Sequence, residues 1–141
     1  MKILIPVDGS AASLRAVEQV LASLVLWREV PQLWLLNVQW ALANGNVKLF
    51  ISQDTLDEYY REQGLAALAR ARAKLDAAGL AYGYHVSVGT PAEAIVRYAQ
   101  EQQIDQIVMA ASSGNSLSSW LLGSVAAKVV EQSHVPVLLV K

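Results

Sequence analysis

The chain has 141 residues, of which 54% are hydrophobic and 16% charged, and its formal net charge at pH 7 is −1. This composition suits one packed domain and argues against a disordered chain, while the absence of a Lys/Arg cluster argues against a nucleic-acid groove or an anionic-membrane patch. The sequence contains no cysteine, which excludes disulfide bonds, thiolate nucleophiles and cysteine-ligated metals.

The amino terminus carries a short apolar run that Pro6 and Asp8 interrupt. The run is too short for the apolar region of a secretory signal, and no stretch reaches the ~20 apolar residues of a membrane helix. We therefore expect a cytoplasmic protein that neither enters nor binds a membrane.

The first predicted elements are a strand and a helix. Residues 3–7 form an apolar run that ends in Asp8-Gly9-Ser10, which is typical of a buried strand followed by a turn and a helix cap. Apolar residues then recur at helical spacing as far as Leu24. This helix should end before Pro31.

The next elements are a second strand and a long helix. Residues 33–38 are a continuous apolar run, which predicts a buried strand. The stretch Ala41 to Gln53 has no clear period and is predicted to be a loop. Asp54 is expected to cap the long helix, and Gly79 should close it.

The second half of the chain continues this alternation. Residues 82–88 alternate in polarity like a strand with one wetter face, and Thr90-Pro91 can begin the helix that follows. Residues 107–110 and 135–140 are apolar runs that predict the last two strands. The helix between them should carry on one side Leu117, Leu121, Val125 and Val129.

This order of elements predicts the fold. Because strands alternate with helices, right-handed crossovers should build a parallel sheet covered on both faces, a doubly wound α/β domain over residues 1–141. In such sheets, ligands bind beyond the carboxyl ends of the strands where the strand order reverses. If the first and fourth strands are neighbours, three segments meet there: Asp8-Gly9-Ser10, the residues around Val38, and residues 110–124.

Small residues dominate the last of these segments, and Gly123-Ser124 lie close to the start of a helix. Small side chains let a ligand approach exposed backbone N–H groups, and a helix start favours an anion. The same composition also suits a flexible connection in which Gly123 only lets two helices pack closely.

Three blocks of the chain resemble the universal stress protein family. They are Ile3-Leu4-Ile5-Pro6-Val7-Asp8-Gly9-Ser10, Gly89-Thr90-Pro91-Ala92-Glu93-Ala94-Ile95, and Leu122-Gly123-Ser124-Val125-Ala126 followed by His134-Val135-Pro136-Val137-Leu138-Leu139-Val140. The blocks are distributed along the whole length of the chain, and they occur in the family's order. The resemblance implies a five-stranded parallel sheet of order 3-2-1-4-5 and a homodimer.

Many members of this family bind ATP through a motif written G-x2-G-x9-G-[ST]. Counted back from Gly123-Ser124, its first two glycine positions fall on Ala110 and Ser113. The chain therefore keeps the final Gly-Ser and replaces both leading glycines. Gly114 stands one place late and could take over the turn, because Ser113 does not readily adopt a positive φ.

The resemblance also assigns the nucleoside end of the ligand. Asp8 matches the acidic residue that contacts this end, and Val38 matches the position whose backbone contacts adenine. Asp8 could instead simply cap the first helix. Trp40 follows the adenine-facing position and could wall the pocket, but packing in the core is the simpler expectation.

The segment from Ala110 to Gly123 contains no Lys or Arg. A bound triphosphate would therefore rely on Mg²⁺, the helix end and neutral donors such as serine hydroxyls to offset its charge. ATP, ADP and AMP all remain open as ligands.

The last strand suggests a homodimer. In a sheet of order 3-2-1-4-5 it lies at an edge, yet Val137–Val140 carries no charge. An uncovered apolar edge is an aggregation liability, and pairing of two such edges across a two-fold axis would remove it. A loop or helix of the same chain is the alternative cover.

The sequence thus supports several functions. The leading one is a universal-stress-type homodimer that binds an adenine nucleotide with Mg²⁺ and acts in stress signalling through unidentified protein partners. A nucleotide-free dimeric interaction module is the alternative, and a slow ATPase with Asp8 as its base is a third. His85 and His134 lie on separate elements without acidic or cysteine partners, which argues against a metal site or a Ser-His-Asp triad.

Overall fold

Strands and helices alternate in the computed structural model, which describes residues 1–41, 51–112 and 122–141. The strands in these ranges are β1 (Lys2–Pro6), β2 (Gln32–Gln39), β3 (Tyr82–Val88), β4 (Gln106–Ala110) and β5 (Val137–Val140). The helices are α1 (Ala11–Ser23), the short 3-10 helix η1 (Leu24–Leu26), α3 (Gln53–Ala77), α4 (Pro91–Glu101) and α5 (Ser124–Gln132).

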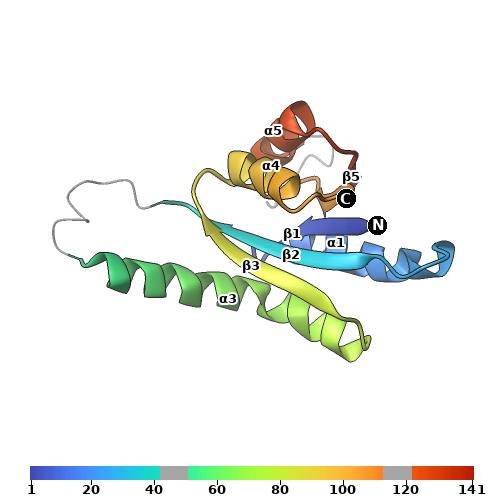
Figure 1. The fold of residues 1–141 in the computed structure, drawn as a ribbon, viewed down its shortest axis with the longest axis horizontal. Helices are drawn as coiled ribbons and strands as arrows, with labels where there is room; N and C mark the ends of the chain where they lie inside the picture. Colours follow the sequence, from blue (N-terminus) through green and yellow to red (C-terminus); the bar gives the residue numbers. More distant parts are fainter. Residues whose placement is uncertain (42–50, 113–121) are drawn as a thin grey trace.

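The strands form one parallel sheet of order β3-β2-β1-β4-β5 (Figure 1). The implied strand order is therefore confirmed, and β5 is an edge strand. The strand order reverses at β1, because the chain adds β2 and β3 on one side of it and β4 and β5 on the other. This switch point is where a doubly wound sheet leaves room for a ligand.

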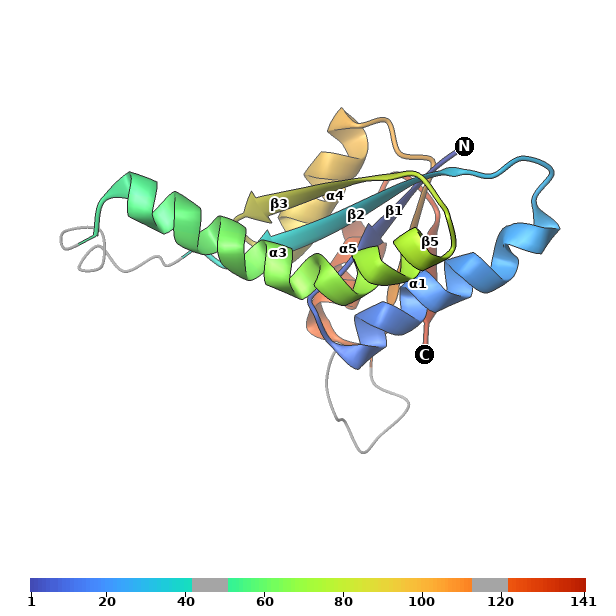
Figure 2. The same ribbon diagram turned by 90° about the horizontal axis from the view of Figure 1, so that it is seen from below.

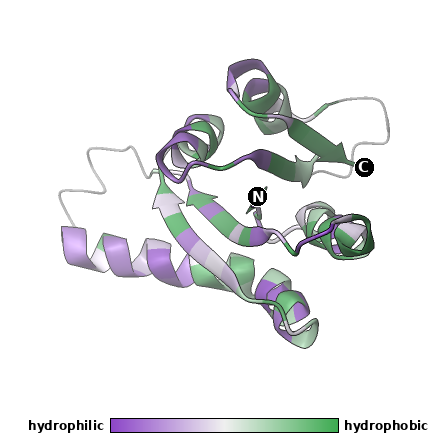
Figure 3. Cartoon of the chain, turned by 45° about the vertical axis from the view of Figure 1, so that its right-hand side comes forward, coloured by the Kyte–Doolittle hydropathy of each residue, from purple (hydrophilic) through white to green (hydrophobic). Residues whose placement is uncertain are grey.

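Helices cover both faces of the sheet, as predicted (Figures 1 and 2). Ile3 and Ile5 pack in the core beneath α1 and α3, whereas Leu4 packs in the core beneath α4 and α5. Neighbouring residues of a strand point to opposite faces of the sheet. Because helices cover both faces, all three side chains are fully buried. Hydrophobic residues fill β5, whereas the amino-terminal half of α3, which extends past the ends of the strands, is mostly hydrophilic (Figure 3).

The helix starts follow local capping rules, with one correction. The Ser10 hydroxyl accepts a hydrogen bond from the Ser13 N–H and caps α1, while Pro91 begins α4 after Thr90. The expectation that Asp54 caps α3 is wrong. Ser52 is the cap, because its Oγ accepts from the Thr55 N–H at 3.2 Å, and Asp54 lies in the first turn.

Two further predictions fall partly beyond the described residues. The predicted loop Ala41 to Gln53 includes residues 42–50, which lie outside them, and Gln53 already belongs to α3. Leu117 and Leu121 also lie outside, so α5 is described only from Ser124.

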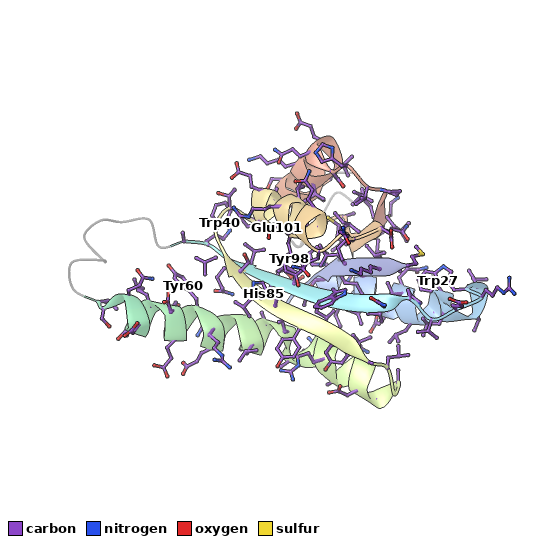
Figure 4. All side chains as sticks on the ribbon, viewed as in Figure 1. Trp27, Trp40, Tyr60, His85, Tyr98 and Glu101 are labelled. Atoms are coloured by element: carbon purple, nitrogen blue, oxygen red, sulfur yellow. The ribbon has the colours of Figure 1, made fainter. Side chains whose placement is uncertain are left out.

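Glycines let helix α3 and Trp34 approach β3 closely. A Cβ on Gly64 would lie 2.3 Å from Val86 Cγ1, and one on Gly83 would lie 2.3 Å from Trp34 Cε3. On the face of β3 that Gly83 shares and that lies opposite α3, the exposed His85 ring stacks on Tyr98 of α4 with centroids 5.3 Å apart (Figure 4). Burial raises the pKa of the Tyr98 phenol.

In the described part of the chain, no helix combines the length and apolar character that crossing a membrane requires.

Candidate functional site

A cavity of about 500 Å³ opens at the carboxyl ends of β1, β2 and β4. The starts of α4 and α5 and the first part of α3 complete its wall. Its volume lies in the usual range for small-molecule sites. The cavity thus occupies the switch point at which the sequence predicted a ligand.

Asp8 lies on the turn that leaves β1 for α1, and it lines this cavity. Its Oδ1 accepts a hydrogen bond from the Ser10 N–H at 2.9 Å, and its own N–H donates to Ser13 Oγ at 3.3 Å. Gly9 between them has φ of +87°, a conformation that glycine adopts without steric cost. Because Ser10 caps α1, the Asp8 side chain supports the turn and does not serve as the cap.

Val38 presents unpaired backbone groups to the cavity. Even-numbered residues of β2 bond toward β1, as the Gln32 N–H to Met1 carbonyl and Val7 N–H to Leu36 carbonyl bonds show. The chain turns into α1 after Val7, so among the described residues no backbone group pairs with the N–H and C=O of Val38. An exposed donor and acceptor side by side on one residue suit the hydrogen-bonding edge of a planar base.

Asn37 adds a buried polar side chain to the lining of the cavity, and the sequence patterns did not predict this role. Its side chain is 2% exposed, it donates to the Val7 carbonyl at 2.8 Å, and its Oδ1 accepts from Gln39 Nε2 at 2.7 Å. These bonds tie the end of β2 to the end of β1. A single amide inside the otherwise apolar run 33–38 was the available signal, because a buried polar side chain needs partners.

Gly123 allows the start of α5 to meet the turn after β4. Its N–H donates to the Ala111 carbonyl at 2.8 Å, and a Cβ placed on it would lie 3.1 Å from Ser112 Cα. Its φ of −63° requires no glycine. Close packing is therefore the reason for glycine here, although the contact is with the turn after β4 and not with a second helix.

Helix α5 points free N–H groups at the cavity. Its first intrahelical bond runs from the Ala127 N–H to the Gly123 carbonyl at 2.9 Å. The three preceding N–H groups, of residues 124–126, have no acceptor within the helix, and these residues line the cavity. Such a helix start favours a bound anion.

The sequence model of the universal stress protein family matches residues 1–141 of this chain. The chain belongs to this family.

Relatives of known structure or sequence share its whole length. Universal stress protein MJ0531 of Methanocaldococcus jannaschii is 32% identical, with 99% of this chain and 81% of the relative covered. The structure of MJ0577 from the same organism has 29% identity and a TM-score of 0.82, covering 99% of this chain and 94% of its own. A universal stress protein in complex with cAMP has 28% identity and a TM-score of 0.71, covering 100% and 97%.

This universal stress protein brings together most of the predicted site residues. Asp8, Val38, Ala110 and Gly123-Ser124 all line the one cavity. Ser113 and Gly114 lie outside the described residues, so their predicted roles at the phosphate turn stay predictions.

Aromatic side chains at the mouth of the cavity depart from expectation. Trp40 is 65% exposed and lines the cavity, so the expected packing in the core is wrong (Figure 4). Trp40 directly follows Gln39, the last residue of β2. Tyr59 and Tyr60 of α3 also line the cavity, and no motif in the sequence had marked them.

Replacing Gly123 with alanine should lower the stability of this universal stress protein by about 1–2 kcal/mol, because the new methyl group presses on backbone atoms of the turn after β4. Urea unfolding would measure this loss. The matched change Ala127→Gly, at an exposed position of the same helix, should cost about 1 kcal/mol through helix propensity alone and leave the cavity unchanged. Equal ligand binding in wild type and Gly123→Ala would contradict a role for this contact in shaping the site.

Proposed function

We propose that this universal stress protein binds an adenine nucleotide in the cavity at the carboxyl ends of its strands and acts in stress signalling through contacts with other proteins. The observation that carries the proposal is that the N–H and C=O of Val38, which make no backbone hydrogen bond among the described residues, share one cavity with the free N–H groups of α5. A base and a phosphate group need these two kinds of partner. A relative with 28% identity and the same fold holds cAMP, which supports the proposal.

Each part of a nucleotide has a matching feature. The Val38 N–H and C=O can pair with the adenine edge, and the Asp8 carboxylate can accept hydrogen bonds from ribose hydroxyls. The start of α5 can hold a phosphate group. Any Mg²⁺ would be bound mainly by phosphate oxygens and water, because Asp8 is the single carboxylate among the described lining residues.

Thermal unfolding with and without nucleotide tests this proposal. A ligand that binds only the folded state stabilises it by about 2.7 kcal/mol at 100 times its Kd. We therefore expect the Tm to rise by several degrees with millimolar AMP, cAMP or ATP, and not with inorganic phosphate. Unchanged Tm values with all three nucleotides would contradict the proposal.

A nucleotide-free interaction module is the second candidate, and one observation favours it. The packing of Gly123 against Ser112 accounts for the retained glycine without any ligand, and Ala110 stands at a motif glycine position. Mass spectrometry of the small molecules released from freshly purified protein separates the two. Stoichiometric adenine nucleotide in the released fraction would rule this module out.

We also propose that the protein is a homodimer joined by its β5 edges. Backbone groups of residues 136, 138 and 140 face β4, since the carbonyls of Pro136 and Val140 accept from Ile107 and Ala111. The groups of Val137 and Leu139 therefore face outward, and Leu138 is 42% exposed beside them. An uncharged edge with free donors and acceptors is a template for a second strand.

Replacing Leu138 with lysine should convert this dimer into a monomer, because it sets two like charges close together where the edges meet. Light scattering during size-exclusion chromatography would show the mass falling by half. The matched variant Val25→Lys charges a side chain that is 88% exposed and lies away from β5, and it should remain dimeric. A wild-type monomer, or a Leu138→Lys dimer, would contradict pairing through β5.

A further inference from the structure

The charge of the cavity limits which nucleotide it can hold. Among its described lining residues Asp8 is the one charged side chain, and it is negative. The positive potential comes from the start of α5, which is equivalent to about half an elementary charge. That potential suits one phosphate group but offsets little of a triphosphate.

The sequence offers no compensating cation on the phosphate side. Between Arg97 and Lys128 no lysine or arginine occurs, and the turn after β4 and the segment that leads to α5 carry no charged side chain. Lys128 itself is exposed on the second turn of α5 and does not line the cavity. The absence of lysine and arginine between Arg97 and Lys128 is a property of the sequence and does not depend on conformation.

The opposite side of the cavity is built for the base. Trp40 is 65% exposed and Tyr59 is 47% exposed, and both line the cavity together with Val38. Aromatic rings bind nucleobases by stacking without regard to phosphate number. The affinity of the site therefore comes from the nucleoside, and every phosphate beyond the first adds charge without adding a cationic partner.

We infer that this cavity selects adenine nucleotides with a single phosphate group, such as AMP or cAMP, over ATP. The inference rests on the proposed nucleotide binding and specifies its ligand class. ATP carries about two more negative charges than AMP near neutral pH, and Asp8 repels those of them that lie within the ~8 Å screening length of its carboxylate. Mg²⁺ would neutralise part of that charge and reduce the difference in affinity between AMP and ATP.

Isothermal titration calorimetry with AMP, cAMP, ADP and ATP tests this selectivity. Without divalent cations we expect ATP to bind about tenfold more weakly than AMP or cAMP, with a smaller ratio when Mg²⁺ is present. Tighter or equal binding of ATP in the presence of EDTA would overturn the selectivity and leave the proposed function standing. Failure of all four nucleotides to bind would overturn both.

A charge-insertion variant sharpens the test. Ser112→Lys places one cation at the turn after β4, inside the cavity wall, and should raise ATP affinity several-fold while AMP affinity changes less. Ala22→Lys adds the same charge at an exposed position near the far end of α1 and should leave the AMP-to-ATP ratio unchanged. Lys48 lies outside the described residues, and Lys48→Gln should also leave this ratio unchanged. A ratio that moves equally in Ser112→Lys and Ala22→Lys, or that shifts in Lys48→Gln, would contradict the inference.

Discussion

Replacing Gly64 with alanine should reduce the free energy of unfolding by about 1–3 kcal/mol and the Tm by roughly 3–10 °C. The new Cβ would lie 2.3 and 2.5 Å from the two Val86 methyl groups and 3.0 Å from Val86 Cβ. Rotation of the valine gives only partial relief, because its Cβ itself lies 3.0 Å from the new atom, so α3 and β3 must also shift apart by a few tenths of an ångström. This cost exceeds the ~1 kcal/mol that alanine gains over glycine in a helix.

A double-mutant cycle makes this prediction specific. Val86→Ala removes both methyl groups, so Gly64→Ala combined with Val86→Ala should be more stable than the sum of the single changes by at least about 1 kcal/mol. Gln63→Ala changes an exposed neighbour on the same helix and should be nearly neutral. Additive single changes would show that the close contact does not hold α3 against β3.

Replacing Val38 with proline should abolish binding of adenine nucleotides while the protein stays folded. Proline removes the N–H that the cavity exposes, and this N–H takes part in no backbone bond of the sheet among the described residues. The residue before it, Asn37, is already extended, as a residue before proline must be. Calorimetry with AMP would measure the loss, which we expect to exceed tenfold in Kd.

Two comparisons separate this effect from a general disturbance. Val38→Ala shortens the side chain but keeps the N–H, so it should bind AMP within a few-fold of wild type. An ester linkage in place of the Asn37–Val38 peptide bond removes the same N–H without adding a ring, and it should weaken binding as proline does. Loss of binding in Val38→Ala, or its retention with the ester, would argue against recognition of the base by this backbone group.

Much of the fold could be predicted from the sequence because its patterns reflect single, strong physical effects. Ile3, Leu4 and Ile5 are buried on both faces of the sheet, and a continuous apolar run is what such a strand requires. The Asp8-Gly9-Ser10 turn combines a residue with positive φ and a helix cap, and both leave clear marks in sequence. The position of the ligand cavity follows from this alternation of elements.

The rest depends on contacts between distant residues, which leave weaker marks. Nothing in the helical pattern around Gly64 shows that Val86 packs against it. The structural role of Asn37 likewise depends on its hydrogen bond to the distant Val7 carbonyl. Trp40 was expected in the core because tryptophan is apolar, but it follows the end of β2 and lines the cavity with 65% of its surface exposed. Ser52 and Asp54 are both good caps, and sequence alone could not rank them.

Titration of ¹⁵N-labelled protein with AMP, followed by its backbone amide signals, tests the proposed nucleotide site directly. We predict that the largest shifts fall on Asp8, Val38 and residues 124–126, at the carboxyl ends of the strands. A second cavity, lined by His134 and Ile104, lies at the other end of α4 and α5 and should stay unchanged. Shifts confined to that second cavity, or no shifts at millimolar AMP, would contradict the account.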